Sequence, residues 1–307
     1  MSDNPVIGFI GLGVMGEPIC RNMLLKSGYS LFVHDIAAEP VARLVAQGAT
    51  AAATMAEVFS QADIVFLSLP GGPQVEAVIA GPGGCLETAR SGQVVVDMST
   101  APVGLTRALA DRLAAKGILL ADAPVARTRQ AAETGTLSIM VGASDAVFAR
   151  IKDLLFMAAS EVTHCGDIGC GQVVKILNNM VLFETVVALS EALVIGEAAG
   201  VGRALLLETL SKGSADSFAL RNHGMKAMVP DVFPVGAFPT EYALKDVSYA
   251  LDLARDMGIL APGAELAERR MTRAREAGFG QEYFPVLTRV VDRITDTPAA
   301  QGKGAGG

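Results

Sequence analysis

The chain has 307 residues and a mass of 31.8 kDa, which favours two domains of ordinary size over one. Its hydrophobic share is 51% against 19% charged residues, and this composition excludes an intrinsically disordered protein. The formal net charge is −7 and no run of Lys or Arg occurs, so nucleic acid would find no basic surface and is not an expected partner.

The most apolar stretch, residues 180–195, does not have the pattern of a membrane span. Glu184 and Glu191 interrupt it, whereas a spanning helix needs about 20 mostly uncharged residues. The four cysteines form no CxxC pair, and the first residues lack a basic segment followed by a long apolar run. We therefore expect a cytoplasmic protein with no membrane partner.

In the first half of the chain, short apolar runs alternate with stretches of helical period. This is the pattern of a parallel sheet with crossover helices. The runs IVFLSL and VVVD are apolar at consecutive positions, as expected for strands covered by helices on both faces. The pattern predicts an α/β fold with strands at 6–11, 31–35, 64–69, 94–98, 118–122 and 137–141.

The second half has a different pattern. After about Asp167 apolar residues recur at intervals of three and four, and no convincing strand remains up to Asp292. The first helix, about 169–199, is apolar on most of its circumference and far longer than the average of about 12 residues, which suggests an oligomer. We predict a dinucleotide-binding domain over 1–167, a helical substrate and oligomerisation domain over 168–293, and a disordered tail over 294–307.

A glycine pattern marks the first strand and the helix after it. Gly11, Gly13 and Gly16 have the G-x-G-x-x-G spacing, and Gly28 marks the predicted end of the helix. The first glycine allows a tight turn, the second leaves room for a pyrophosphate, and the third lets the helix pack closely on the strand. This context predicts a site for a dinucleotide cofactor.

Asp35 follows the second strand, 24 residues after Gly11. An acid near this offset accepts hydrogen bonds from the adenosine ribose hydroxyls and repels a 2′-phosphate, so we expect NAD rather than NADP. The alternative is that Asp35 only caps the end of the strand.

Together with this fingerprint, four further segments resemble those of the β-hydroxyacid dehydrogenases, the family of 3-hydroxyisobutyrate dehydrogenase, tartronate semialdehyde reductase and the 6-phosphogluconate dehydrogenases. In chain order they are VVDMSTAPV, the DAPV…GTLSIMVGA block, GCGQVVKILNN and KDVSYAL. The match runs from about residue 6 to residue 292. The resemblance implies a Rossmann-type doubly wound sheet followed by an all-helical domain, with an active site in the cleft between them.

The resemblance also implies roles for individual residues. Lys175 would be the general acid/base, and Lys245 would lie over the cofactor. Substrate contacts would come from Ser99, Thr100, Ala126, Arg127, Thr128, Asn178 and Asn179. Cofactor contacts would come from Gly11, Leu12, Gly13, Val14, Met15, Gly16, Asp35, Leu69, Pro70, Thr100 and Lys245.

The spacing of Lys175, Asn178 and Asn179 places the three side chains on one helix face. Partial burial would lower the pKa of the lysine, so that it takes the substrate's hydroxyl proton in oxidation and returns it in reduction. Asn179 would hold the hydroxyl. The alternatives are that Lys175 is an ordinary surface lysine and that Ser99 and Thr100 form a helix N-cap.

The chain departs from the family at Arg127. In most of the family DAPV continues as Ser-Gly-Gly, whereas this chain has Ala126, Arg127 and Thr128. A guanidinium favours an anion with more oxygens or more charge, and the variant resembles that of the sulfolactaldehyde reductases. The alternative is that Arg127 points to solvent or pairs with Glu133.

Other features carry less weight. The three histidines have no Cys or carboxylate partners at ligand spacing, so we expect no metal site. We expect a small anionic hydroxy acid or aldehyde as substrate and a homodimer or homotetramer. A serine-type dehydrogenase, an imine reductase and a non-catalytic dinucleotide-binding sensor or scaffold are the alternatives, although imine reductases typically lack the lysine retained here.

Overall fold

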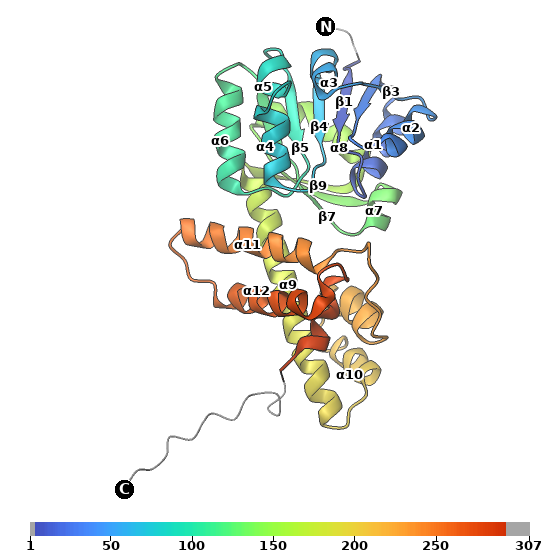
Figure 1. Ribbon diagram of the computed structural model, residues 1–307, viewed down its shortest axis with the longest axis vertical. Coiled ribbons are helices and arrows are strands. Elements are labelled where there is room, and N and C mark those ends of the chain that lie inside the picture. The colour runs from blue at the N-terminus through green and yellow to red at the C-terminus, as the bar shows by residue number, and fades with distance from the viewer. Residues whose placement is uncertain (1–3, 293–307) are drawn as a thin grey trace. The chain divides into compact units, whose positions relative to one another are not determined.

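The computed structural model describes residues 4–292 and divides into two compact units, Met1–Leu177 and Asn178–Gly307 (Figure 1). The division falls inside the long helix α9 (Cys170–Ala198), whereas our predicted boundary at residue 167 precedes that helix. The predicted tail, 294–307, lies outside the described residues.

The N-terminal unit contains a sheet of nine strands in the order β3-β2-β1-β4-β5-β6-β8-β7, with β9 paired to β8. The first six of these run parallel in the strand order of a Rossmann fold, which confirms the predicted doubly wound α/β class. The six predicted strands are β1 (Ile7–Ile10), β2 (Leu31–His34), β4 (Ile64–Leu67), β5 (Val94–Asp97), β6 (Leu119–Asp122) and β8 (Leu137–Gly142). The sequence pattern missed β3 (Thr50–Ala51), β7 (Val125–Ala126) and β9 (Ala159–Gly166).

The direction of β8 differs from the predicted parallel arrangement. It pairs antiparallel with both β6 and β7. A parallel return needs a crossover of a dozen or more residues, usually a long helix. The connection after β6 instead contains β7, itself paired to β8, and only the six-residue helix α7 (Arg129–Thr134), so β8 returns in the opposite direction.

Alternate residues of the central strands enter different cores. Phe9, Phe66 and Val96 belong to one apolar cluster, whereas Val65 and Val95 belong to another. The sheet is therefore buried on both faces, as its consecutive apolar residues predict. The helices of this unit before α9 are α1 (Gly16–Ser27), α2 (Ala38–Val45), α3 (Met55–Gln61), α4 (Gly72–Ala80), α5 (Cys85–Thr88), α6 (Val103–Ala114), α7 and α8 (Asp145–Phe156).

The C-terminal unit is helical, and residues 178–292 contain no strand beyond an isolated bridge between Pro239 and Tyr283. Its core packs the rings of Phe183, Phe238 and Phe284 against each other, with centroids 5.3 to 6.1 Å apart. After α9 the elements are α10 (Arg203–Leu210), the π-helix η1 (Leu220–Met228), α11 (Thr240–Asp256), α12 (Pro262–Ala274), the π-helix η2 (Arg275–Phe279) and the 3₁₀-helix η3 (Phe284–Val290).

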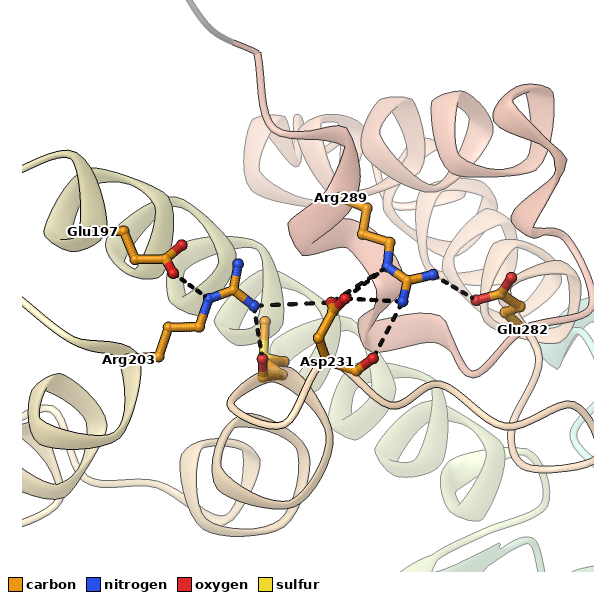
Figure 2. A network of polar contacts seen from close by, with 6 residues as sticks. Glu197, Arg203, Asp231, Glu282 and Arg289 are labelled. Atoms are coloured by element: carbon orange, nitrogen blue, oxygen red, sulfur yellow. Dashed lines mark hydrogen bonds and ion pairs between the residues drawn. The ribbon is translucent and has the colours of Figure 1, made fainter.

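A network of ion pairs ties the ends of these helices together (Figure 2). Arg203 bonds Glu197 at 2.7 Å, and Arg289 bonds Asp231 at 3.0 Å and Glu282 at 3.4 Å. Asp231 lies between the two guanidiniums, since its carboxylate is also 3.8 Å from Arg203. The network joins the end of α9 to the start of α10 and to η3.

Helix α9 is long and apolar enough to cross a membrane by length and composition alone. From the sequence, residues 180–195 are not predicted to span a membrane, because Glu184 and Glu191 interrupt the apolar stretch. In the structure Phe183, Val186 and Leu193 of this helix are fully buried in the core of the C-terminal unit. That burial accounts for part of the high hydropathy of the helix, since 44% of its most apolar window is buried.

Candidate active site

The glycine-rich loop has the geometry that its spacing predicts. Gly11 has φ +92°, and a Cβ there would lie 2.3 Å from the Ser68 carbonyl oxygen. A Cβ at Gly16 would lie 2.0 Å from the Gly11 carbonyl oxygen, so helix α1 can start this close to β1 only with glycine. Gly13 is different, because a Cβ there would meet no protein atom within 4 Å. The open space beside Gly13 fits a ligand that approaches the backbone closely.

Asp35 holds the glycine-rich loop by hydrogen bonds to its backbone. Its carboxylate accepts hydrogen bonds from the backbone N–H of Leu12 and from that of Ala37, the latter at 2.7 Å. The residue is half-buried. The predicted ribose contact and the alternative strand-end cap are therefore compatible, since the bonds to Leu12 and Ala37 already place the carboxylate beside the glycine loop.

A pocket of about 510 Å³ opens beside Gly13 between α1, α2 and α7. Arg43 donates two hydrogen bonds of 2.7 Å to Glu17, and these bonds lower the pKa of Glu17. Arg129 pairs with Glu133 at 3.0 Å. The pocket lining is thus polar and rich in arginine, with Leu12, Gly13, Val14, Glu17, Pro18, Arg21, Arg43, Arg129 and Glu133.

The segments after β4 and β5 are bonded to each other. The backbone N–H of Leu69 donates to the Ser99 hydroxyl at 2.9 Å, and the Ser99 N–H donates to Asp97 at 3.0 Å. Ser99 is buried, whereas Thr100 is half-buried and Pro70 is exposed. Helix α6 starts after Pro102 without a side-chain cap, so the alternative role of Ser99 and Thr100 as its N-cap is not seen.

The start of helix α9 is held by a buried carboxylate. Asp122, at the end of β6, accepts the N–H of Gly169 at 2.6 Å and that of Gln172 at 2.7 Å. Burial raises the pKa of Asp122 to about 6 and that of the neighbouring Asp97 to about 7. Lys175 follows Gln172 by three residues, on the same helix, and is half-buried.

The predicted residues of the C-terminal unit form a second polar group. Asn179 is buried and donates to Asp246 at 2.7 Å, and its side-chain oxygen accepts a bond of 3.1 Å from Asn178, which is exposed. Lys245 lies 3.2 Å from the other oxygen of Asp246. Its ammonium is also 5.3 Å from the ring centroids of both Tyr242 and Tyr249, a cation–π arrangement.

Arg127 is exposed, as the alternative of a solvent-facing side chain predicts, and it also bonds other parts of the chain. Its guanidinium donates to the Thr136 carbonyl at 2.6 Å and to the Ser160 hydroxyl at 2.7 Å, and Glu133 pairs with Arg129 instead. Ala126 lies in β7, and the Thr128 hydroxyl caps α7 by accepting the Ala131 N–H. The predicted contact of these residues with a substrate anion stays a prediction.

Sequence reasoning missed three residues that organise the site. They are Asp97, Asp122 and Gln172, which bond the loops and α9 together. The sequence offers only a weak signal for these residues. Asp97 and Asp122 end the neighbouring strands β5 and β6, and Gln172 lies about one helical turn before Lys175. Among residues 4–292 no group of three His, Cys, Asp or Glu side chains could hold a metal ion.

Comparison with known proteins gives matches over nearly the whole described chain. Residues 6–166 match the model for the NAD-binding domain of 6-phosphogluconate dehydrogenase. Residues 169–291 match the model described as NAD-binding of NADP-dependent 3-hydroxyisobutyrate dehydrogenase.

Similar proteins include dehydrogenases and reductases of hydroxy acids. A 2-(hydroxymethyl)glutarate dehydrogenase of Eubacterium barkeri is 37% identical over 97% of this chain and 98% of its own. A 3-sulfolactaldehyde reductase of Escherichia coli is 34% identical over 92% of this chain and 95% of its own. The solved structure of Mycobacterium tuberculosis 3-hydroxyisobutyrate dehydrogenase with L-serine superposes with a TM-score of 0.86 at 27% identity, covering 94% of this chain and all of that one.

Proposed function

Since this chain belongs to the β-hydroxyacid dehydrogenase family and is an NAD(P)-dependent oxidoreductase of the 3-hydroxyacid type, we propose that it uses NAD, with Lys175 as the general acid/base. The proposed substrate is a small β-hydroxy acid with a terminal anion, either 3-hydroxyisobutyrate-like or a sulfonate analogue, interconverted with its aldehyde or ketone.

The preference for NAD is supported by Asp35. Its carboxylate is bonded to the N–H of Leu12, next to the open space at Gly13. A 2′-phosphate brought against this carboxylate would place like charges together, whereas ribose hydroxyls can donate to it. The residue after Asp35 is an exposed Ile36, which offers no charge to a phosphate.

The role of Lys175 is supported by where the start of α9 is anchored, and this observation carries the proposal. Gln172 bonds loop 99–101 through its side chain and Asp122 through its backbone, and Lys175 lies one turn further along. The lysine, the proposed substrate loop and the Ser99 bond to Leu69 therefore belong to one connected structure. A bound nicotinamide would supply hydride transfer, while Lys175 would take the hydroxyl proton in oxidation and return it in reduction.

The substrate class is supported by the relatives. Their names describe a hydroxymethyl dicarboxylate and a sulfonated aldehyde, and both place an anion beyond the reacting carbon. Thr100 and the N–H groups around Thr128 are the candidate partners for such an anion in this chain. No observation favours the imine reductase alternative, since the similar imine reductases are 18 to 19% identical and show the fold alone.

The test is turnover at 340 nm with NAD or NADP and a panel of 3-hydroxyisobutyrate, serine, 2-(hydroxymethyl)glutarate and dihydroxypropanesulfonate. We expect kcat/KM with NAD to exceed that with NADP by about tenfold or more, which corresponds to about 1.4 kcal/mol of discrimination. Lys175→Met should lower kcat about 100-fold or more and leave NAD affinity nearly unchanged. Lys152→Met, which changes an exposed lysine of α8, is the matched control and should keep full activity. Equal use of both cofactors, or an active Lys175→Met enzyme, would contradict the proposal.

A further inference from the structure

The side chain of Gln172 joins segments that are 73 residues apart in the chain. Its amide nitrogen donates to the Ser99 carbonyl at 2.7 Å, and its amide oxygen accepts the Ala101 N–H at 3.1 Å. The two bonds lie on either side of Thr100. Gln172 is fully buried, where a polar group that loses its partner is costly, so this paired contact is specific.

The backbone of Gln172 is fixed as well. Its N–H donates to Asp122, which also accepts the N–H of Gly169, so the carboxylate holds the first turn of α9. The approach is close, because a Cβ at Gly171 would lie 2.8 Å from the Asp122 carboxylate and 2.5 Å from the Met140 carbonyl oxygen. Gln172 therefore holds loop 99–101 to a helix turn that is itself anchored on β6.

The connection continues toward the proposed cofactor site. Ser99, whose carbonyl accepts from Gln172, also accepts the Leu69 N–H through its hydroxyl. In the other direction, Lys175 lies three residues after Gln172, almost one helical turn. A shift of the Gln172 side chain would thus move loop 99–101 relative to the lysine.

We propose that Gln172 is a positioning residue for the reaction: it fixes loop 99–101 at the distance from Lys175 that proton transfer requires. This inference rests on the proposed function of Lys175 and Thr100. Gln172 touches neither substrate nor cofactor in the proposal, and it acts through the two segments that it joins.

The primary test is Gln172→Met, which keeps the length of the side chain and removes both hydrogen bonds. Gln93→Met is the matched control, because Gln93 is also buried and its amide donates to the carbonyls of Phe59 at 2.8 Å and Ala62 at 2.6 Å. Gln93 lies just before β5, whereas loop 99–101 lies after the other end of that strand. Both variants lose buried hydrogen bonds, and only one loses the link to the site.

We expect Gln172→Met to lower kcat about tenfold to 100-fold, since small displacements of reacting groups have effects of this size, with NAD affinity within about threefold of wild type. Hydrogen exchange of the amides of residues 98–102 should become faster in Gln172→Met. Gln93→Met should leave both kcat and this exchange unchanged even where its Tm falls equally.

A second variant covers the case in which Gln172→Met does not fold. In Gln172→Glu the carboxyl can still accept the Ala101 N–H, but it donates to the Ser99 carbonyl only when protonated. Burial raises the pKa of a carboxyl at this position, and the carboxylates of Asp122 and the nearby Asp97 raise it further where they are ionised. The kcat of this variant relative to wild type should therefore recover as the pH is lowered.

Two results would overturn the inference: a kcat within twofold of wild type in either Gln172 variant at every pH, or an equal loss in Gln93→Met. A wild type that turns over no hydroxy acid would instead contradict the proposed function. Hydrogen exchange of residues 98–102 still reports on the link in that case, because it does not depend on turnover.

Discussion

At the scale of single residues, Arg127 combines the backbone of a glycine with the side chain of an arginine. Its φ is +84°, in the left-handed region that non-glycine residues rarely adopt. Most of the family has glycine at this position, by the resemblance of the DAPV segment. The structure uses the guanidinium to bond Thr136 and Ser160, which holds the segment after β7 against β8 and β9.

Arg127→Gly should therefore act on the loop and not on one kind of anion. The free energy of unfolding should change by less than about 1 kcal/mol, because relief of the positive φ offsets the two lost hydrogen bonds. KM should rise by a similar factor for carboxylates and sulfonates in steady-state assays. Ser160→Ala, which removes one of the two partners, should give a smaller rise with the same pattern. A rise in KM confined to the sulfonate or the dicarboxylate would instead support the direct contact between Arg127 and the substrate anion that the sequence predicts.

Asp97 is a buried carboxylate whose ionisation costs stability. Burial raises its pKa to about 7, so the folded protein binds this proton more tightly than the unfolded chain does. The resulting contribution to stability is present at pH values below the pKa of an unfolded aspartate, about 3.9, and is lost as the pH rises through about 7. Asparagine resembles the protonated form and does not ionise.

Asp97→Asn should accordingly gain stability relative to wild type as the pH rises from 5 to 8. Asparagine can still accept the Ser99 N–H, so the loop contact is kept. Urea unfolding at several pH values measures the difference, and a gain of about 1 kcal/mol or more is expected, since one pKa unit corresponds to about 1.4 kcal/mol. Parallel stability curves for variant and wild type would contradict the assignment of a raised pKa.

At the scale of elements, the sequence predicted those that carry strong apolar periodicity. Helix α9 was expected at about 169–199 and spans Cys170–Ala198. β9 was missed because it is an edge strand with mostly partly exposed side chains, so no apolar run marks it. The glycine loop and Asp35 were predictable because their spacing is local. The bonds of Asp122 and Gln172 were not, since they join residues 47 to 73 positions apart, which only the fold brings together.

Two helical glycines with opposite surroundings test the close contact at the start of α9. In Gly171→Ala the new methyl would meet the Met140 carbonyl, the Asp122 carboxylate and the Gly142 nitrogen, all within 2.9 Å. The helix would have to shift, and the expected loss of stability is about 1 to 3 kcal/mol. Gly104→Ala in α6 meets no atom within 4 Å and should gain about 0.5 to 1 kcal/mol by reducing the entropy of the unfolded chain. Equal effects in denaturant unfolding would contradict the packing described for Gly171.

At the scale of the whole molecule, one face of α9 is apolar and exposed. Val174, Val181, Ala188 and Ile195 recur at intervals of seven residues, so they lie along one side of the helix. Val174, Val181 and Ile195 are 42%, 58% and 67% exposed. Exposed apolar side chains that line up in a stripe along one side of a surface helix are candidates for an interaction site. Since paired helices also carry apolar residues at a spacing of seven, we propose that this stripe contacts a second copy of this chain.

Val181→Lys should then disrupt self-association. A charge buried against the apolar stripe of another copy has no partner, so association should weaken by several kcal/mol, enough to dissociate the oligomer at micromolar concentration. Sedimentation equilibrium of the wild type should give a dimer or tetramer, and that of the variant a smaller species. Leu205→Lys is the control, because Leu205 is 63% exposed on α10 and lies outside the stripe. A monomeric wild type, or equal dissociation in both variants, would show that the stripe does not pair two copies.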